Sequence, residues 1–428
     1  MFSFLFRGGI ARAACLLALA APAWAQAPLS LQEAQRIAVA RSQQLAAQDA
    51  AAASVREMSV AAGQLPDPVL KVGVQNLPVS GPDRFSLTRD FMTMRSIGVM
   101  QEITRSDKRR LRVERAQREG ERIQAERVET TANIQRDTAL AWIERRYAQA
   151  MVELIRRQVQ EAQLEVQGAE IAYRSGRGSQ AEFFGSRAAV INLQDKLRQT
   201  ERQAQAATLM LARWIGPEAV KRPLAGDVDW RRTEAASLTT EEHFRHLPHL
   251  AVLAAQVQAA ETDVRQARTN TQPDWTVEAM YSQRGPAYSN MVSIGVSIPL
   301  QIDRANRQDR EVAAKLATLA EAQAKYEDAL RLHETEVRVM VNDWTSGKER
   351  IEQLTTHLLP AAKLRTEAAL TAYQTAKGPL TAVLAARREE VDARMQLLAL
   401  EMETARLWAQ LTYLVPDPNA LPALKDQP

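Results

Sequence analysis

The sequence predicts a mainly α-helical, elongated protein with a small β part, built as an internal tandem repeat. Three observations support this fold class. Stretches rich in Ala, Gln, Glu, Arg and Leu run for tens of residues without proline, as in long helices. The turn signal AYRSGRG at 172–178 recurs as AYQTAKG at 372–378. Hydrophobic residues make up 46% and charged residues 25% of the 428 residues, which is typical of a folded protein.

The first 25 residues are expected to be a signal peptide that is removed on export. Arg7 and Arg12 provide a basic start before an apolar run that is too short to span a membrane. Ala23-Trp24-Ala25 then has the A-x-A form of a cleavage site. The alternative, a lipoprotein acylated on Cys15, is disfavoured because Arg12 lies three residues before this cysteine and the apolar run follows it.

The mature chain is expected to lack cysteine and to be nearly neutral. Cys15 is the only cysteine, so its removal would leave no disulfide, thiol ligand or cysteine nucleophile. Removing Arg7 and Arg12 leaves 53 of the 55 Lys and Arg residues, against 51 Asp and Glu residues. This balance gives no electrostatic basis for binding nucleic acid.

The first half predicts a helix followed by two strands. Apolar residues at helical spacing cover 30–64, and Pro66-Asp67-Pro68 ends that helix. Apolar and polar residues then alternate at about 69–76 and again at about 95–103. This alternation indicates strands with one apolar face.

A very long helical hairpin follows these strands. Residues 107–174 contain no proline and only two glycines, so they predict a helix of roughly 100 Å at about 1.5 Å per residue. A helix of this length needs coiled-coil packing against other helices. A turn near 175–179 precedes a second helix that extends to about residue 214.

The second half repeats this order. Pro273-Asp274 repeats Pro66-Asp67, and SIGV at 293–296 repeats SIGV at 96–99. Strands are expected at about 274–282 and 291–300, and a helical stretch at about 304–373 in which Gly347 and Pro360 are interruptions. A second turn near 375–379 precedes a last helix to about 414. The predicted divisions are a signal peptide (1–25), a first repeat (26–216), a linker (217–240), a second repeat (241–416) and a C-terminal tail (417–428).

Four strands cannot close a barrel, so two interpretations of them remain open. Either they form a small soluble sheet, or several chains pool their strands into one closed barrel of outer-membrane strand length. In a barrel, the polar face would line a water-filled lumen, and Trp275 and Tyr281 would lie at the two membrane interfaces. The candidate lumen-facing residues are Lys71, Gln75, Glu102, Thr276 and Glu278.

The order and duplication of these segments over residues 30–415 resemble the TolC family of outer-membrane efflux channels. The resemblance implies a homotrimer whose helices form an α-barrel across the periplasm of a Gram-negative bacterium. It also implies a shared 12-stranded β-barrel in outer-membrane lipid. The hairpin tips would then dock a periplasmic adaptor protein, which links the channel to an inner-membrane pump of the resistance-nodulation-division type.

The two turns therefore become candidate adaptor-contacting tips. Gly178 and Gly378 are expected to permit positive φ, Ser179 to cap the following helix, and Pro379 to occupy the first helical position of the next one. The first turn has Gly176 where the second has Ala376, so the two tips could differ in shape. The candidate residues are Arg177, Gly178, Ser179, Glu182, Lys377, Gly378 and Pro379.

The stretch FMTMRSIGVMQEI, residues 91–103, resembles channels of the heavy-metal subgroup, which exports cobalt, zinc and cadmium or copper and silver. Thioethers suit Cu(I) and Ag(I), although methionine is also a common gap filler. Histidines three residues apart could bind zinc or copper, but Pro248 interrupts their helical spacing. The weak candidate ligands are Met92, Met94, Met100, His243, His246 and His249, and no bound metal or other cofactor is expected.

Other functional classes have less support. Glu389, Glu390 and Asp392 could line a cation-selective mouth, but pairing with Arg387 and Arg388 on a solvated face is the simpler interpretation. No P-loop, dinucleotide fingerprint, H-E-x-x-H motif or nucleophile elbow is present, so no enzyme is expected. The alternatives to metal export are export of organic drugs or secreted polypeptides by the same channel type and, more remotely, a soluble periplasmic coiled-coil scaffold.

Overall fold

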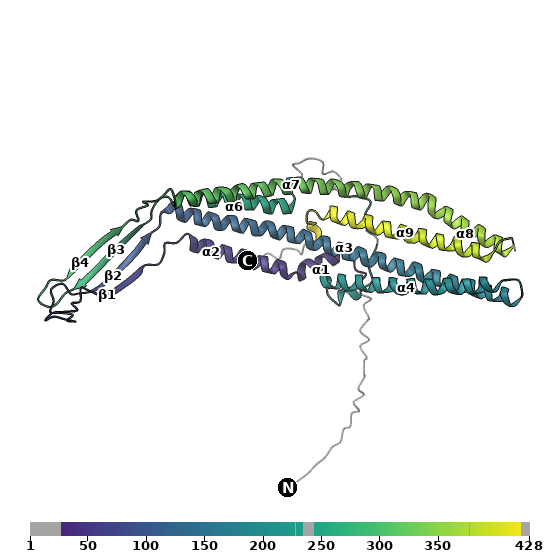
Figure 1. Cartoon of the computed structure of the whole chain (residues 1–428), viewed down its shortest axis with the longest axis horizontal. Helices are drawn as coiled ribbons and strands as arrows, with labels where there is room; N and C mark the ends of the chain where they lie inside the picture. Colours follow the sequence, from purple (N-terminus) through teal and green to yellow (C-terminus); the bar gives the residue numbers. More distant parts are fainter. Residues whose placement is uncertain (1–26, 227, 234–243, 376, 421–428) are drawn as a thin grey trace, which may run out of the picture.

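A computed structural model describes residues 27–420 of the chain, except 227, 234–243 and 376. The expected signal peptide, all of it before residue 27, and the tail beyond residue 420 lie outside the described residues. The molecule is a long rod of helices with a four-stranded sheet at one end (Figure 1). Within the described residues, no helix has both the length and the apolar character needed to cross a membrane.

The predicted fold class is confirmed, because long helices dominate and four strands interrupt them. In the first half the elements are α1 (Leu31–Arg41), α2 (Gln43–Ala62), β1 (Val69–Gln75), β2 (Met94–Ile103), α3 (Ser106–Arg174) and α4 (Gln180–Ile215). In the second half they are α6 (Pro248–Thr269), β3 (Trp275–Gln283), β4 (Met291–Ser297), α7 (Gln308–Gln353), the π segment η3 (Leu354–Leu358), α8 (Leu359–Gln374) and α9 (Leu380–Thr412).

The first helical region is two helices, where the sequence indicated one. Ser42 has extended backbone angles, with φ −69° and ψ 114°, and separates α1 from α2. Its side chain accepts a hydrogen bond from the backbone N–H of Leu45 at 3.3 Å. Serine favours such caps because its hydroxyl replaces a missing helical hydrogen bond.

The long helix of the second half is interrupted just before Pro360, as the sequence indicated. Residues Leu354–Leu358 form a π-helical segment between α7 and α8. Proline has no N–H to donate and its ring crowds the preceding turn, so a local widening is a common response. Gly347, by contrast, does not interrupt α7. It is buried against α9, where an added Cβ would lie 2.5 Å from Thr404 Oγ1.

The hydrophobic core lies at the middle of the rod, where both halves meet. Corresponding tryptophans of the two long helices, Trp142 and Trp344, are buried there, and each donates its indole N–H to a backbone carbonyl. Trp142 bonds Leu29 at 3.3 Å and Trp344 bonds Trp230 at 2.9 Å. The duplication therefore extends to the way in which each half anchors a non-helical segment on its long helix.

Candidate functional site

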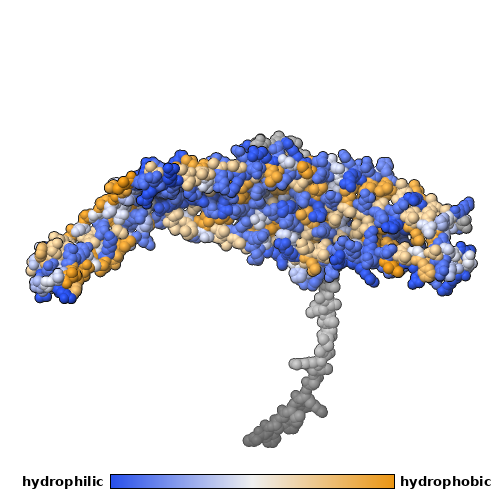
Figure 2. All heavy atoms as spheres, viewed as in Figure 1, coloured by the Kyte–Doolittle hydropathy of each residue, from blue (hydrophilic) through white to orange (hydrophobic). Residues whose placement is uncertain are grey.

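The sheet is antiparallel, with strand order β1-β2-β3-β4, and its register separates two faces. One row of partners is Leu70, Val99, Ala279 and Ile294, and the next is Val72, Ile97, Tyr281 and Val292. These side chains are exposed to an unusual degree, for example 73% for Val72 and 78% for Ile294. Hydrophobic surface accordingly follows the sheet end of the molecule (Figure 2). An exposed apolar sheet face of this kind marks an interaction with lipid or another protein.

All five predicted lumen-facing residues lie on the opposite face. Lys71 is the register partner of Gly98, which in turn is the partner of Met280, two residues from Glu278. Glu278 itself is the partner of Met100. The side chains of Lys71 and Glu278 therefore share this face. Gln75 is the register partner of Met94, and Glu102 and Thr276 are register partners of each other. All three lie on the same face. The structure therefore brings together the polar positions that the alternation indicated.

One pair of these five residues forms an ion pair. The Lys71 ammonium lies 2.7 Å from Glu278 Oε2, although their strands are separated by β2. Gly98, which lies between them, has no side chain to block this bridge. Further hydrogen bonds on this face run from Gln75 Nε2 to Met280 Sδ at 3.3 Å and from Thr104 Oγ1 to Glu102 Oε1 at 3.3 Å.

Four methionines share this polar face. Met94, Met100, Met280 and Met291 all occupy its register positions, and none occupies the apolar face. Met100 and Met280 are diagonal neighbours on β2 and β3, and Met280 and Met291 are diagonal neighbours on β3 and β4. Such neighbours are about 7–8 Å apart, which long side chains can bridge. Met92 lies in the loop before β2 and is 50% exposed.

The predicted histidine set is not brought together as a site. His243 lies outside the described residues, and His246 is exposed. His249 Nδ1 lies 2.8 Å from Glu129 Oε1, and its ring packs edge-on against His333 with centroids 5.0 Å apart. Over the described ranges, no group of three or more His, Cys, Asp or Glu side chains has a metal-binding arrangement.

The first hairpin tip is closed by a complete capping box. The Ser179 hydroxyl accepts from the backbone N–H of Glu182 at 3.1 Å, and Glu182 Oε2 accepts from the backbone N–H of Ser179 at 2.9 Å. These bonds satisfy donors at the start of α4. They also hold the pKa of Glu182 below its usual range, because backbone N–H groups stabilise the carboxylate.

Positive φ was expected at Gly178 and Gly378, but neither has it; at the first tip it occurs at Gly176, with φ +71°. Gly178 is required for a different reason. Its N–H donates to the Ala172 carbonyl at 3.0 Å, and an added Cβ would lie 3.1 Å from Ala172 Cβ. Gly378 makes the same close approach to Ala372, where an added Cβ would lie at 3.2 Å. The corresponding residue 376 lies outside the described residues.

The second tip has no side-chain cap of its own. Pro379 is the N-cap residue in extended conformation, whereas the sequence indicated the first helical position. The cap comes from the first tip, because Glu182 Oε1 accepts the backbone N–H of Leu380 at 3.2 Å. One carboxylate therefore caps two helices, and the contact spans 198 residues of sequence.

An apolar cluster holds the two tips together beneath these caps. Tyr173 and Phe183 stack with centroids 6.1 Å apart, and Leu380 and Val383 are buried beside Ala169. Arg177, Ser179, Lys377 and Pro379 remain exposed at the end of the rod. Exposed positive charges therefore lie above an apolar base at this end of the rod.

The acidic residues above the second tip are paired. Glu389 pairs with Arg365, Glu390 with Arg394, and Asp392 with Lys196 at 3.4 Å and Arg388 at 3.9 Å. Arg387 instead reaches α3, 3.0 Å from Glu161 and 3.3 Å from Glu165. Burial raises the pKa of Glu165, and the Arg387 charge opposes that rise.

A similar cross-half contact at the sheet end was not recognised in the sequence. Asp274 Oδ1 accepts the backbone N–H of Arg105, and its Oδ2 lies 2.8 Å from the buried Lys108 ammonium. Asp274 thereby ties the start of β3 to the corner between β2 and α3. The only sequence signal for this contact was the repeated Pro-Asp dipeptide, which does not indicate which residue Asp274 contacts.

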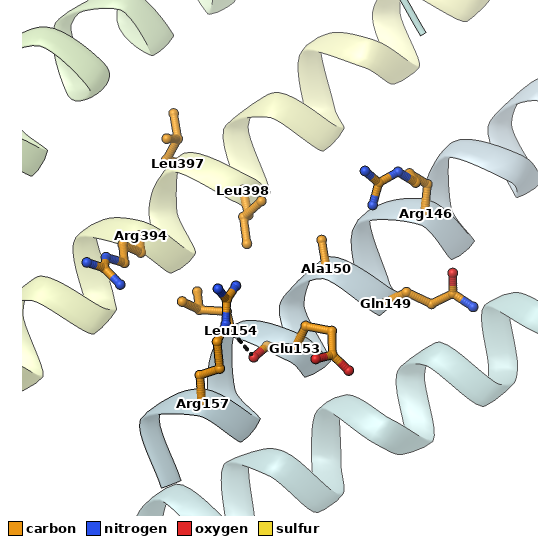
Figure 3. A pocket seen from close by; sticks show the side chains of 9 residues that line it. All are labelled: Arg146, Gln149, Ala150, Glu153, Leu154, Arg157, Arg394, Leu397 and Leu398. Atoms are coloured by element: carbon orange, nitrogen blue, oxygen red, sulfur yellow. Dashed lines mark hydrogen bonds between the residues drawn. The ribbon is translucent and has the colours of Figure 1, made fainter. Parts of the chain in front are cut away.

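One groove between the helices is lined mainly by arginines and leucines. The groove in Figure 3 has a volume of about 570 Å³ between α3 and α9. Arg146, Arg157 and Arg394 line it with leucines, and Arg157 Nε donates to the Glu153 backbone carbonyl at 3.3 Å. Its only acidic side chain is Glu153, so a paired acid and base do not converge on it.

Residues 244–415 match the family model described as Outer membrane efflux protein. The chain is also similar to solved channels, each over 90% of its length. These include the outer-membrane channel OprN (16% identity, TM-score 0.75, 90% of that chain), VceC from Vibrio cholerae (18%, 0.73, 95%) and CusC (15%, 0.72, 92%). No curated protein matches. At these identities, the similarity establishes a shared fold.

Proposed function

We propose that this protein is the outer-membrane channel of a tripartite efflux system. The two-faced sheet carries this proposal, since one face is apolar and exposed while the other is polar. Lipid would cover the first face and water would fill the space behind the second. The match of residues 244–415 to the outer membrane efflux family supports the same conclusion.

The sheet edges favour assembly from several copies. β1 and β4 are edge strands, and unpaired backbone groups are not tolerated in lipid. Four strands are too few to close a barrel, so neighbouring copies must supply the missing partners. Three copies would pool 12 strands, as the resemblance to the TolC family implies, and the helices would extend the passage through the periplasm.

The tips would dock the adaptor that connects the channel to an inner-membrane pump. Arg177, Ser179, Lys377 and Pro379 are exposed there on a packed base. Gly178 and Gly378 shape the turns, and Glu182 fixes both helix starts. The chain would conduct passively, and the energy for transport would come from the pump.

The cargo that we favour is a heavy-metal cation, with soft monovalent copper or silver first. The row Met100, Met280 and Met291 on the polar face supports this assignment, because thioethers prefer soft ions. The Lys71 charge is neutralised by Glu278, so the row does not face an unpaired cation there. Separate thioethers bind weakly, which suits a conduit that must release its cargo. Organic drugs and secreted polypeptides are the alternative cargo.

The test is complementation of a deletion strain with this chain. We expect the deletion strain to be sensitive to copper and silver, or to zinc, cobalt and cadmium, but not to dyes and antibiotics. The chain should restore its resistance. The triple variant Met100→Leu/Met280→Leu/Met291→Leu should lower silver resistance, whereas Met58→Leu/Met210→Leu, changed at exposed helical sites, should not. Sensitivity to drugs alone would overturn the metal assignment and leave the channel intact.

A further inference from the structure

The corner between β2 and α3 has a counterpart between β4 and α7, although two residues separate β2 from α3 and ten separate β4 from α7. Arg105, the residue before α3, is followed by Ser106-Asp107-Lys108, and Arg307, the residue before α7, is followed by Gln308-Asp309-Arg310. Counted from the start of each helix, Arg310 therefore corresponds to Lys108. In the same way, Pro66-Asp67 before β1 corresponds to Pro273-Asp274 before β3, so Asp67 corresponds to Asp274.

The first corner is closed by the Lys108–Asp274 ion pair, whereas the corresponding Asp67 and Arg310 form no ion pair among the described residues. Asp67 and Arg310 are both exposed. Among the described residues, neither has an ion-pair partner or a side-chain hydrogen bond. The strands next to them, β1 and β4, are the opposite edges of the sheet, about 14 Å apart at three strand spacings, and the two residues do not pair in one copy.

Strand directions show where the missing partner would come from. β2 runs toward the helical body and β3 runs away from it, so the end of β2 lies beside the start of β3. β4 likewise runs toward the helical body, and β1 runs away from it. If β4 of one copy pairs with β1 of the next, the start of α7 lies beside the neighbour's Asp67, as α3 lies beside Asp274.

We infer that Asp67 of one copy forms an ion pair with Arg310 of a neighbouring copy and closes each junction between protomers. This inference rests on the proposed pooling of strands between copies. The backbone part of the first corner is not repeated, because the Arg307 N–H already donates to the Arg304 carbonyl at 3.3 Å. The guanidinium of Arg310 can bind both oxygens of a carboxylate, whereas the lysine at the first corner presents a single ammonium.

The test uses full-length chains with reversed charges and two different affinity tags. In Asp67→Arg chains alone, or Arg310→Asp chains alone, every junction has like charges. We expect the dissociation temperature of the detergent-extracted oligomer to fall in both cases. Co-expression of the two variants restores opposite charges only at junctions between unlike chains. Mixed oligomers should therefore exceed the random proportion, on the order of tenfold per junction if the pair contributes about 1.4 kcal/mol.

Two controls separate this contact from general damage. Asp83→Arg changes a loop carboxylate at the far end of the strands and should not bias the mixing. The milder variants Asp67→Asn and Arg310→Gln should lower the dissociation temperature non-additively, because removing either one already breaks the pair. Random mixing with unchanged dissociation temperatures, in an oligomer that conducts ions, would overturn the pair and leave the channel function standing. A monomeric, non-conducting wild-type chain would overturn both.

Discussion

The two helical hairpins of this chain begin from the same turn signal and end differently. The α3–α4 tip has its own capping box from Ser179 and Glu182. At the corresponding positions, the α8–α9 tip has Pro379 and Ala382, and its helix start is capped by Glu182 of the first hairpin. A repeated motif thus conserves the path of the backbone without conserving the interactions that stabilise it.

The two long helices also differ, and again the helix of the first half is the more regular one. α3 is a single helix of 69 residues, whereas its counterpart is divided into α7, the π segment and α8. α7 also packs more tightly at Gly347, while Gly168 of α3 has nothing within 4 Å of an added Cβ. The first hairpin is therefore the continuous and self-capped one, and the second depends on its neighbours.

The largest expected effect comes from comparing glycines in the two long helices. Gly347→Ala would press a methyl group against the buried Thr404, and we expect a loss of about 1–3 kcal/mol in the free energy of unfolding. Gly168→Ala, on an exposed face of α3, should instead stabilise by about 0.5–1 kcal/mol. Chemical denaturation in detergent measures both. Equal effects would show that the helices are equally packed.

Next in size is Glu182→Ala, which removes the caps of α4 and α9 together. A lost cap costs about 1 kcal/mol, so hydrogen exchange should accelerate at both 180–184 and 380–384. Ser179→Ala is the matched control and should accelerate exchange at the first segment only. If Glu182→Ala left 380–384 protected, the second tip would not depend on the first.

A smaller effect should come from Glu165, which joins the two hairpins through Arg387. Because burial raises its pKa above the ordinary value of 4.5, the folded state holds this proton more tightly than the unfolded state. Stability should therefore fall as the pH rises from about 4.5 through the raised folded pKa. Glu165→Gln should remove this decline in a melting-temperature series. Glu161→Gln removes a neighbouring negative charge that also raises this pKa, so it should weaken the decline without abolishing it.

The smallest effect should come from His333, which is present only in the second long helix. Burial lowers its pKa, and the neighbouring His249 lowers it further. The unfolded state then binds the proton more tightly, so stability should be complete above the ordinary pKa of 6.5 and fall as the pH drops below it. His333→Gln should flatten the melting temperature between pH 7 and pH 5. If the slope of melting temperature against pH stayed unchanged, a group other than His333 would be responsible for the pH dependence.

Local patterns in the sequence predicted what depends on local physics. Alternation in Leu70, Val72 and Val74 predicted a two-faced strand, and Pro360 predicted a break in the long helix. Gly347 was misjudged as an interruption because composition does not reveal what packs against a glycine. The Glu182–Leu380 and Asp274–Lys108 contacts could not be predicted, since they join residues 198 and 166 positions apart.

Because Glu182 caps helices of both halves, the second half depends on the first for the cap of α9. A chimera built from two copies of the first half would have a carboxylate at each tip. One built from two copies of the second half would have Ala382 at both positions and no acid for either helix start. The two halves are therefore not interchangeable, because the start of α9 depends on a carboxylate that only the first half carries.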